Sequence, residues 1–342
     1  MLIDGHNDLA WVMRKLHNYD LDAIDLSQLA PAFHTDISRL RKGGVTGQFW
    51  SVYAPSTLSG SQAAVVTVEQ IMFVRAFIER FPDDLVFATC ADDVVNADQT
   101  GRIASLIGLE GGHCIDESLT ILEMMYALGA RYMTLTHNHN TSWADSATDE
   151  RKLGGLNPFG RQVVQRMNQL GMLVDLSHVS TEVMIDALSI TTAPAIFSHS
   201  SARALVDVPR NVPDDVLSLL AKNNGVYMVA FVSDFVSEEF AQWYKNKDSK
   251  DPGVPPIVTV EHVADHVEHI REVAGIDHVG IGADFDGTTD MPTELNNVST
   301  YPLLMDTLTN RGWSLPELEK LRSGNILRVL RDAEEVANTR TS

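Results

Sequence analysis

Short apolar runs rich in β-branched residues recur along the whole chain and alternate with segments of helical periodicity. The eight runs are residues 2–9, 44–54, 102–112, 130–138, 171–178, 194–200, 225–233 and 278–287. Strands that are apolar on both faces are typical of a parallel sheet covered by helices. Eight strand and helix units of this kind predict an α/β protein with a closed (β/α)8 barrel, the TIM barrel.

Two of the intervening segments show helical spacing clearly. Residues 117–129 and 161–171 predict helices, and in the second segment Val163, Val164 and Met167 fall on one face. Each segment ends at a glycine, which suits the C-terminal cap of a helix.

The chain shows no linker, low-complexity tract or repeat that would divide it. Its 342 residues, 44% of them hydrophobic, suffice for one large core, although length alone also permits two smaller domains. We therefore expect residues 1–342 to form a single barrel domain. Residues 234–256, which contain KNKDSKDPGVPP, predict an exposed loop or insertion.

Charge and cysteine content exclude several classes of protein. The 26 basic and 46 acidic residues give a net charge of -20, which would repel nucleic acid and anionic membranes. The two cysteines, Cys90 and Cys114, have neither the number nor the spacing of a disulfide scaffold or a cysteine zinc site. Neither a cationic start with an apolar run nor a stretch of about 20 apolar residues is evident. We expect a cytoplasmic protein with no nucleic-acid or membrane partner.

Six of the eight predicted strands end at a side chain that can bind a metal ion or transfer a proton. These residues are His6 and Asp8, Glu110, His137, His178, His199 and Asp284. The C-terminal ends of barrel strands converge on one mouth, so residues far apart in the sequence meet there. Histidine and carboxylate ligands suit zinc and related transition metals.

Each of these residues also has an ordinary structural interpretation. His6 and Asp8 point to the same face if the strand alternates, but a His-x-Asp triplet also occurs at hydrogen-bonded strand ends. Glu110 follows an apolar run, where a carboxylate is costly to bury unless a cation compensates it, and an arginine would serve as well as a metal. His178 and His199, taken singly, fit histidines that are hydrogen-bonded at the barrel mouth.

The combination favours a metal centre. Two histidines from successive strands, a carboxylate and a His-x-Asp pair provide ligands for two metal ions that share Glu110 and a bridging hydroxide. By contrast, His262, His266 and His269 lie among acidic residues on what the pattern indicates is a solvated helix face, and we expect no metal site there.

Seven motifs in order resemble the renal (membrane) dipeptidase family of the amidohydrolase superfamily. They are DGHNDL, GLEGGH, TLTHNHNTSWADS, LVDLSHVS, IFSHSSAR, PRNVPDD and GADFDG, and they span nearly the whole chain. The resemblance implies a metallo-dipeptidase with two zinc ions. His6 and Asp8 would bind the first ion, His178 and His199 the second, and Glu110 would bridge them.

The resemblance also implies roles for three further residues. His137 would contact the substrate carbonyl oxygen, Arg210 would bind the dipeptide carboxylate, and Asp284 would shuttle the proton. The alternatives are a loop histidine, a surface arginine in a salt bridge, and an aspartate that caps a helix. Asp286, two residues beyond Asp284, competes with it on the same face of the predicted strand.

The chain departs from the mammalian pattern of that family. His139 stands where those members have a disulfide cysteine, and segments for secretion and lipid anchoring are not evident. The resemblance therefore implies a bacterial, cytoplasmic member, with an unlinked homodimer as one candidate assembly and L-D dipeptides among the candidate substrates. Hydrolysis of an N-acyl amino acid, a lactone or a β-lactam, and a barrel that only binds, are the rival hypotheses.

Overall fold

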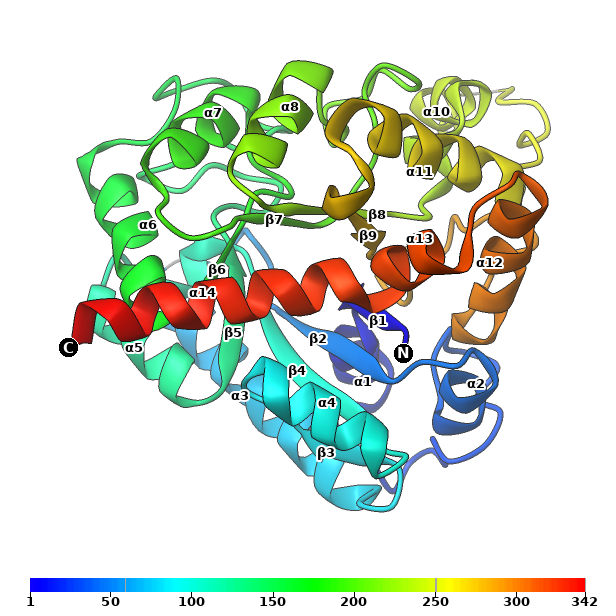
Figure 1. Ribbon diagram of the computed structural model, residues 1–342, viewed down its shortest axis with the longest axis horizontal. Coiled ribbons are helices and arrows are strands. Elements are labelled where there is room, and N and C mark those ends of the chain that lie inside the picture. The colour runs from blue at the N-terminus through cyan, green and yellow to red at the C-terminus, as the bar shows by residue number, and fades with distance from the viewer. Residues whose placement is uncertain (59, 250, 342) are drawn as a thin grey trace.

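A closed ring of parallel strands forms the centre of the computed structural model, which describes residues 1–58, 60–249 and 251–341 (Figure 1). The ring runs β1–β2–β4–β5–β6–β7–β8–β9 and closes from β9 to β1. The strands are β1 (Ile3–Asn7), β2 (Gly47–Tyr53), β4 (Ile103–Glu110), β5 (Ala130–Thr134), β6 (Leu173–Asp175), β7 (Ile196–Ser200), β8 (Val226–Val229) and β9 (Val279–Ile281). All eight predicted strands are present, and the (β/α)8 barrel is confirmed.

The structure adds a strand that the sequence pattern did not reveal. Strand β3 (Leu85–Phe87) pairs with the first half of β4, where Leu85 lies opposite Ile103. Strand β5 takes over the same edge of β4 from Ile107 onward. With only three residues, β3 is too short to show a periodic pattern, and it lies outside the closed ring.

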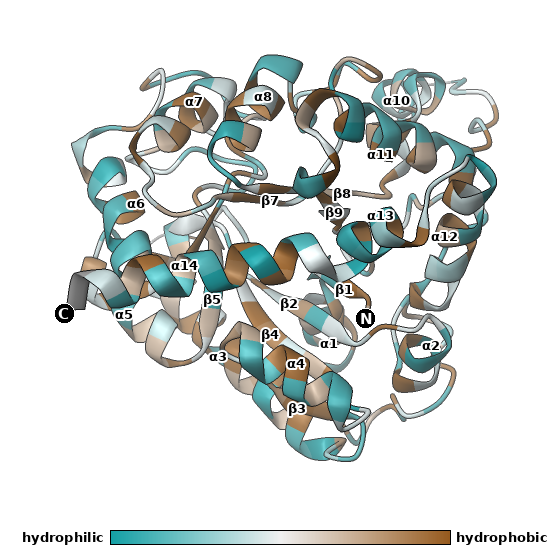
Figure 2. Cartoon of the chain, in the orientation of Figure 1, coloured by the Kyte–Doolittle hydropathy of each residue, from teal (hydrophilic) through white to brown (hydrophobic). Residues whose placement is uncertain are grey.

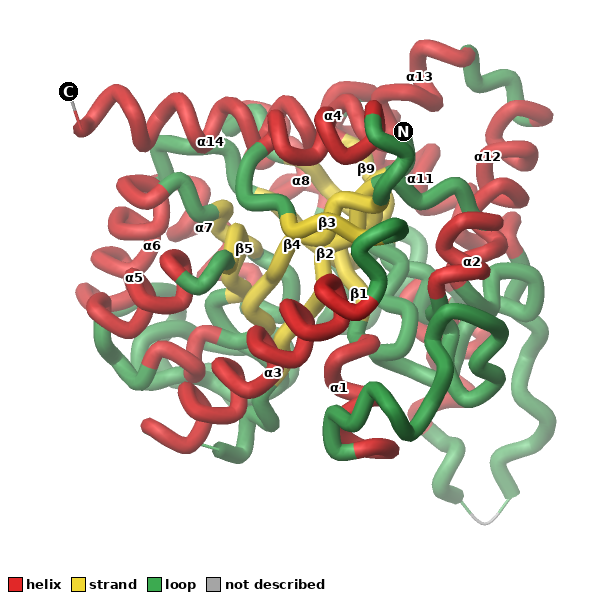
Figure 3. Tube along the Cα trace, turned by 90° about the horizontal axis from the view of Figure 1, so that it is seen from below, coloured by secondary structure: helices red, strands yellow, loops and turns green. Residues whose placement is uncertain are grey.

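Helices surround the barrel on its outer side (Figures 1 and 3). They are α1 (Leu9–His17), α2 (Ile37–Lys42), α3 (Ser61–Arg80), α4 (Ala91–Gln99), α5 (Leu119–Ala127), α6 (Pro158–Leu170), α7 (Thr181–Ile190), α8 (Asp214–Lys222), α9 (Ser233–Val236), α10 (Glu238–Lys245), α11 (Val260–Ala274), α12 (Tyr301–Asn310), α13 (Leu315–Glu319) and α14 (Asn325–Thr341). The strands are mainly hydrophobic, whereas the helices carry their polar residues on the outside (Figure 2).

Helix α14 closes the N-terminal end of the barrel. It crosses that end in Figures 1 and 3, and its apolar residues Ile326, Leu330 and Ala333 belong to the same buried cluster as Ile3 and Leu173 at the strand starts. Because α14 covers this end, the end left for a ligand is the one at the C-terminal ends of the strands, where the predicted metal ligands lie.

The two predicted helices are present as α5 and α6, with small shifts at their ends. Helix α6 begins at Pro158, before the predicted start, because Asn157 caps it by accepting hydrogen bonds from the backbone N–H groups of Phe159 and Gly160. It ends at Leu170, and Gly171, its C-terminal cap, adopts a left-handed conformation with φ of 77°.

Residues 234–256 only partly form the expected exposed loop. Most of α9 and all of α10 lie in this range, and Phe240 packs into the core because its helix is amphipathic. Residues 251–256 form neither helix nor strand, and Val254 is 89% exposed.

One helix among the described residues is long and apolar enough to cross a bilayer by length and composition. This is α3, which the sequence analysis did not single out, and 56% of its apolar window is buried inside the protein. Burial of this kind also occurs in the core helices of water-soluble folds, so α3 alone does not indicate a membrane span.

Candidate active site

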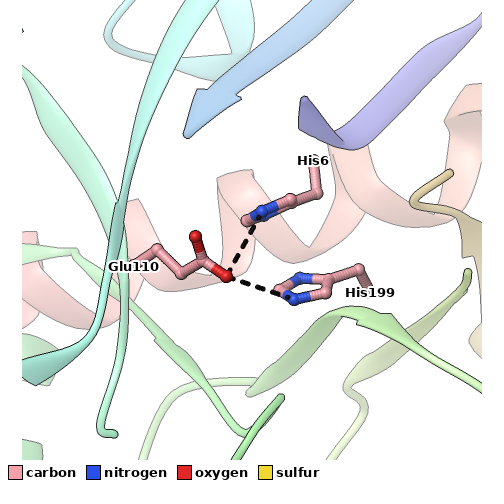
Figure 4. Close-up of side chains that lie close together, drawn as sticks. All are labelled: His6, Glu110 and His199. Carbon is pink, nitrogen blue, oxygen red and sulfur yellow. Dashed lines mark ion pairs between the residues drawn. The ribbon is translucent and has the colours of Figure 1, made fainter. Parts of the chain in front are cut away.

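The predicted metal ligands meet at the C-terminal end of the barrel. His6 lies on β1, Glu110 ends β4 and His199 lies on β7, and their side chains point toward one another (Figure 4). His178 follows β6 by three residues, and Asp8 stands at the N-terminal cap of α1. Asp8 is therefore beyond the end of β1, yet its Oδ2 lies 3.2 Å from Nε2 of His6.

One oxygen of Glu110 lies at the centre of this cluster. Its Oε1 is 3.0 Å from Nε2 of His178 and 3.6 Å from Nε2 of both His6 and His199. Nε2 of His137 lies 3.5 Å away. Glu110 thus belongs to two groups that could each hold an ion, one with His6 and His199 and one with His137 and His178.

Neighbouring side chains fix how two of these histidines are protonated. The Ser198 hydroxyl donates its proton to the buried carboxylate of Asp175. Nδ1 of His199 lies 2.8 Å from Ser198 Oγ, so this nitrogen carries a proton and donates it to the serine oxygen. The Nε2 atom of His199 then presents a lone pair to the cluster. The hydroxyl oxygen of Tyr132 makes the corresponding contact with Nδ1 of His6, at 2.8 Å. Such outer contacts orient metal-binding histidines.

The cluster fits a metal centre on its own chemistry. Nε2 of His6, one of the nitrogens that face Glu110, is buried and has no hydrogen bond among the described residues. Burial lowers the pKa of His6, but Tyr132, Asp8 and Glu110 outweigh it and raise that pKa well above its usual value. A positive charge is therefore favoured beside Nε2 of His6. The three imidazoles and two carboxylates are ligand types that suit zinc.

The carboxylate of Glu110 remains ionised in these surroundings. Burial by itself raises its pKa, but the facing imidazoles, first His6 and then His137, outweigh burial and hold the pKa of Glu110 well below its usual value. Ser51 donates a hydrogen bond of 3.1 Å to the other oxygen, Oε2. The arginine that could have neutralised Glu110 as an ion pair is not within 4.0 Å among the described residues, which removes that alternative.

Two site residues adopt a backbone conformation that is rare outside glycine. His178 and Asp284 both have φ of 67°, in the left-handed region. Such a conformation costs on the order of 1–3 kcal/mol per residue and is found mainly where function requires it. Gly287 provides space beside Asp284 and Asp8, because a Cβ atom there would lie 2.2 Å from Oδ1 of Asp284 and 2.6 Å from Oδ2 of Asp8.

A cavity of about 500 Å³ opens above the cluster, which is the size that suits a small ligand. Another cavity, of about 570 Å³, lies elsewhere on the protein. Residues that line the catalytic cavity are Asp8, Trp11, Tyr53, Glu110, His137, Asn138, Thr148, His178, Arg210, Val232, Asp234, Phe235, Tyr244, Asp284, Gly287 and Thr288. Several of these could not be found from the sequence, because they carry no metal-binding group: Trp11 on α1, Tyr53 at the end of β2 and Tyr244 on α10.

Arg210 is buried in this cavity, not exposed at the surface. Its side chain donates to Ser200 Oγ and to the backbone oxygen of His199, both at 3.2 Å, and its guanidinium lies 5.1 Å from the ring centre of Phe235. No carboxylate lies within 4.0 Å of it in the described part of the chain. The alternative of a surface salt bridge is wrong, and the guanidinium is open to an anionic ligand.

His137 and Asp284 also face the cavity. Burial lowers the pKa of His137 to about 4, so its imidazole is neutral near pH 7. Burial also raises the pKa of Asp284 well above its usual value, and the carboxylates of Asp8 and Glu110 raise it further. His137 and Asp284, for which a loop histidine and a helix-capping aspartate were the alternatives, are therefore both part of the cavity wall.

Asp286 does not share the face of Asp284, contrary to the sequence analysis. Strand β9 ends at Ile281, so side chains no longer alternate at these positions. The backbone N–H of His34 donates to Asp286 Oδ1 at 2.7 Å, and Asp286 lines a neighbouring cavity.

The helical histidines also differ from expectation in one respect. His266 lies on the buried face of α11 and is 1% exposed, because it follows the same stripe as Val263 and Ile270. Its Nδ1 accepts a hydrogen bond from the backbone N–H of Ala202, whereas Nε2 of His269 bonds Asp214. The two rings therefore have separate partners, and the expectation of no metal site here stays a prediction.

Comparisons with known proteins agree with this geometry. The chain is 41% identical to dipeptidase 3 of mouse and, equally, of rat over 340 residues, covering 98% of this chain and 65% of each relative. It thus spans less than two thirds of the length of these relatives.

Two solved structures share the fold. One is described as dipeptidase AC, a metallopeptidase of family M19, with a TM-score of 0.85 and 24% identity over 97% of this chain and 98% of that one. The other is a metallopeptidase from Rhodobacter sphaeroides bound to a phosphinate mimic of L-Ala-D-Ala, with a TM-score of 0.84 and 23% identity over 97% and 99%. At these identities the likeness shows the fold.

The sequence profile of the membrane dipeptidase family matches residues 1–342, the whole chain. The match agrees with the motifs and with the clustered histidines and carboxylates at the barrel mouth. The chain belongs to the membrane dipeptidase family, peptidase family M19.

Proposed function

We propose that the protein is a zinc-dependent dipeptidase that hydrolyses the peptide bond of dipeptides at this cavity. The observation that carries the proposal is the shared position of Glu110, between two groups of potential ligands and beside a buried Arg210 that has no carboxylate partner. The relatives named dipeptidase, and the dipeptide mimic bound to the Rhodobacter sphaeroides protein, support the same substrate class.

Two zinc ions are the proposed cofactors. His6 and Asp8 would hold one ion, His178 and His199 the other, and Glu110 both. When bound, the ions supply Lewis acidity, which polarises the scissile carbonyl group and makes water more acidic. The short distances from Glu110 Oε1 to three histidine nitrogens support the shared arrangement.

The chain's own residues bind the substrate and move the proton. Arg210 binds the C-terminal carboxylate through two parallel N–H groups, which fixes the peptide carbonyl above the cluster. His137 donates a hydrogen bond to the carbonyl oxygen as negative charge develops there. Asp284 accepts a proton from the attacking water and passes it to the leaving amine, a role that its raised pKa favours.

A panel of dipeptides tests the proposal. The purified protein is stripped of metal with a chelator, reconstituted with zinc and assayed for amino acid release from L-L, L-D and D-L dipeptides. The proposal predicts hydrolysis after reconstitution and none after stripping. Hydrolysis of N-acyl amino acids, lactones or β-lactams with no dipeptide turnover would contradict it, and so would metal binding without turnover of any of these compounds.

Other expectations from the sequence remain predictions. They are a bacterial origin, a cytoplasmic location, the absence of a membrane partner, a single domain and a homodimer as a candidate assembly. Light scattering of the purified protein measures the last of these, because a dimer would have twice the 37.7 kDa mass of one chain.

A further inference from the structure

Asp234 is a carboxylate in the catalytic cavity that has no ionic partner. It lies on α9, in the segment that follows strand β8, and is partly buried. No lysine, arginine or histidine nitrogen lies within 4.0 Å of it in the part of the chain that the structure describes. Its role is not explained by metal binding, because it belongs to none of the potential ligand groups at the barrel mouth.

The position of Asp234 favours a cationic ligand. Burial raises its pKa, which means that the ionised form lacks full solvation. An approaching cation would replace the missing water and stabilise the carboxylate. Arg210 is the opposite case in the same cavity, since it is a buried cation without an anionic partner. Apart from the carboxylates already given a role in metal binding or proton transfer, the cavity therefore leaves one positive and one negative group open to the substrate.

Asp234 lies on the Arg210 side of the cavity. The next residue, Phe235, places its ring 5.1 Å from the Arg210 guanidinium, and Asp234 and Arg210 interact electrostatically. If Arg210 binds the C-terminal carboxylate, the part of a dipeptide nearest to Asp234 is the side chain of its C-terminal residue. The α-ammonium group belongs to the other residue, on the far side of the scissile bond.

We propose that Asp234 binds a cationic side chain on the C-terminal residue of the dipeptide and makes the enzyme favour lysine or arginine there. This inference rests on the proposed function, because it takes the binding of the carboxylate by Arg210 as its reference point. Asp234 is in this account a residue that determines specificity and takes no part in proton transfer.

The experiment compares substrates that differ only in charge at that side chain. We expect the zinc-reconstituted wild-type enzyme to have a kcat/KM for Ala-Lys about tenfold above that for Ala-norleucine, the uncharged analogue. Asp234→Asn should bring this ratio close to one. Asp290→Asn is the matched control, because Asp290 lies near Asp234 but lines the neighbouring cavity. It should keep the wild-type ratio.

Each result separates the possible roles of Asp234. An equal rate for Ala-Lys and Ala-norleucine in the wild-type enzyme would overturn the inference, whether or not the variants fold. An equal loss for both substrates in Asp234→Asn would also overturn it, because it would assign Asp234 to the α-ammonium group that both share. If no dipeptide is hydrolysed, the proposed function fails. The affinities of the enzyme for Ala-Lys and Ala-norleucine are then compared by calorimetry. Equal affinities for the two dipeptides would overturn the inference.

Discussion

The Tyr132 hydroxyl lies 2.8 Å from Nδ1 of His6 inside the barrel. The same hydroxyl donates a hydrogen bond of 3.1 Å to the backbone oxygen of Gly5. Because a phenol has one proton to donate, His6 must carry its own proton on Nδ1, and Nε2 is left free for a metal ion. Gly108 makes room for the ring, since a Cβ atom there would lie 2.0 Å from Cζ of Tyr132.

Tyr132→Phe should weaken metal binding without changing a ligand. The variant loses the oxygen that fixes the protonation of His6, and we expect about tenfold lower zinc affinity, measured by competition with a chelator. Tyr227→Phe is the control, because the Tyr227 hydroxyl is also buried and donates to the backbone oxygen of Ser201 at 2.8 Å. Equal zinc affinities of the two variants would show that Tyr132 has only a structural role.

Asp284→Asn should keep the metal ions and the fold but lose turnover by about 100-fold or more. An amide can neither accept the proton of water nor return it to the amine. Asp286→Asn should cause a far smaller loss, because Asp286 accepts its hydrogen bond from His34 and does not face the cluster. Steady-state kinetics with metal analysis of both variants checks this, and inactivation by Asp286→Asn alone would reverse the assignment.

Arg210→Ala should lower kcat/KM for dipeptides by at least about 30-fold, which corresponds to about 2 kcal/mol of binding energy. Arg210→Lys should restore part of it, since an ammonium group cannot form the two parallel bonds of a guanidinium. The same clamp predicts that wild-type enzyme cleaves C-terminally amidated dipeptides poorly. Comparable cleavage of a dipeptide and its amide would show that the clamp does not exist.

The free energy of unfolding should decrease as the pH is lowered, in part because of His266. Burial, with His269 and His262 nearby, lowers its pKa from 6.5 to about 3. As the pH falls below 6.5, His266 takes up a proton in the unfolded chain but not in the folded one, which favours the unfolded chain. The stability that the neutral ring contributes is therefore fully present above pH 6.5 and is lost toward pH 3. This single group changes the free energy of unfolding by up to about 1.4 kcal/mol per pH unit.

Chemical denaturation between pH 7 and pH 4 measures this effect as a difference between variants. His266→Gln should show a shallower decrease in the free energy of unfolding than the wild-type protein, although it is less stable at pH 7. His17→Gln, at a partly exposed histidine of α1, should keep the wild-type slope. Parallel slopes for His266→Gln and the wild type would contradict the assigned cause.

The barrel could be predicted from the sequence because its strands are continuous apolar runs that alternate with helical segments, and six of the eight runs end at histidines or carboxylates. Strand β3 could not, since Leu85–Phe87 is too short for a pattern and its pairing depends on the shape of β4. The burial of His266 was missed for a related reason. The many acidic neighbours in the sequence concealed a stripe in which His266 follows Val263 and Ile270 on the inner face of α11.

The metal-binding residues were identifiable because their chemistry is visible in the sequence, but the groups that support them were not. Tyr132 and Asp175 lie in apolar runs, where the sequence shows no sign that they contact His6 or Ser198. The separate directions of Asp284 and Asp286 depend on where β9 ends. Such contacts between distant residues arise only when the barrel closes.

Metal content of Glu110→Gln tests the central claim most directly. Glutamine keeps the shape of the side chain but removes the charge that both ions would share. Elemental analysis after zinc reconstitution should find two zinc ions per wild-type chain and fewer than two per variant chain, with dipeptide turnover lost in parallel. A Glu110→Gln chain that holds two ions and remains active, or a wild-type chain that holds one, would contradict the account.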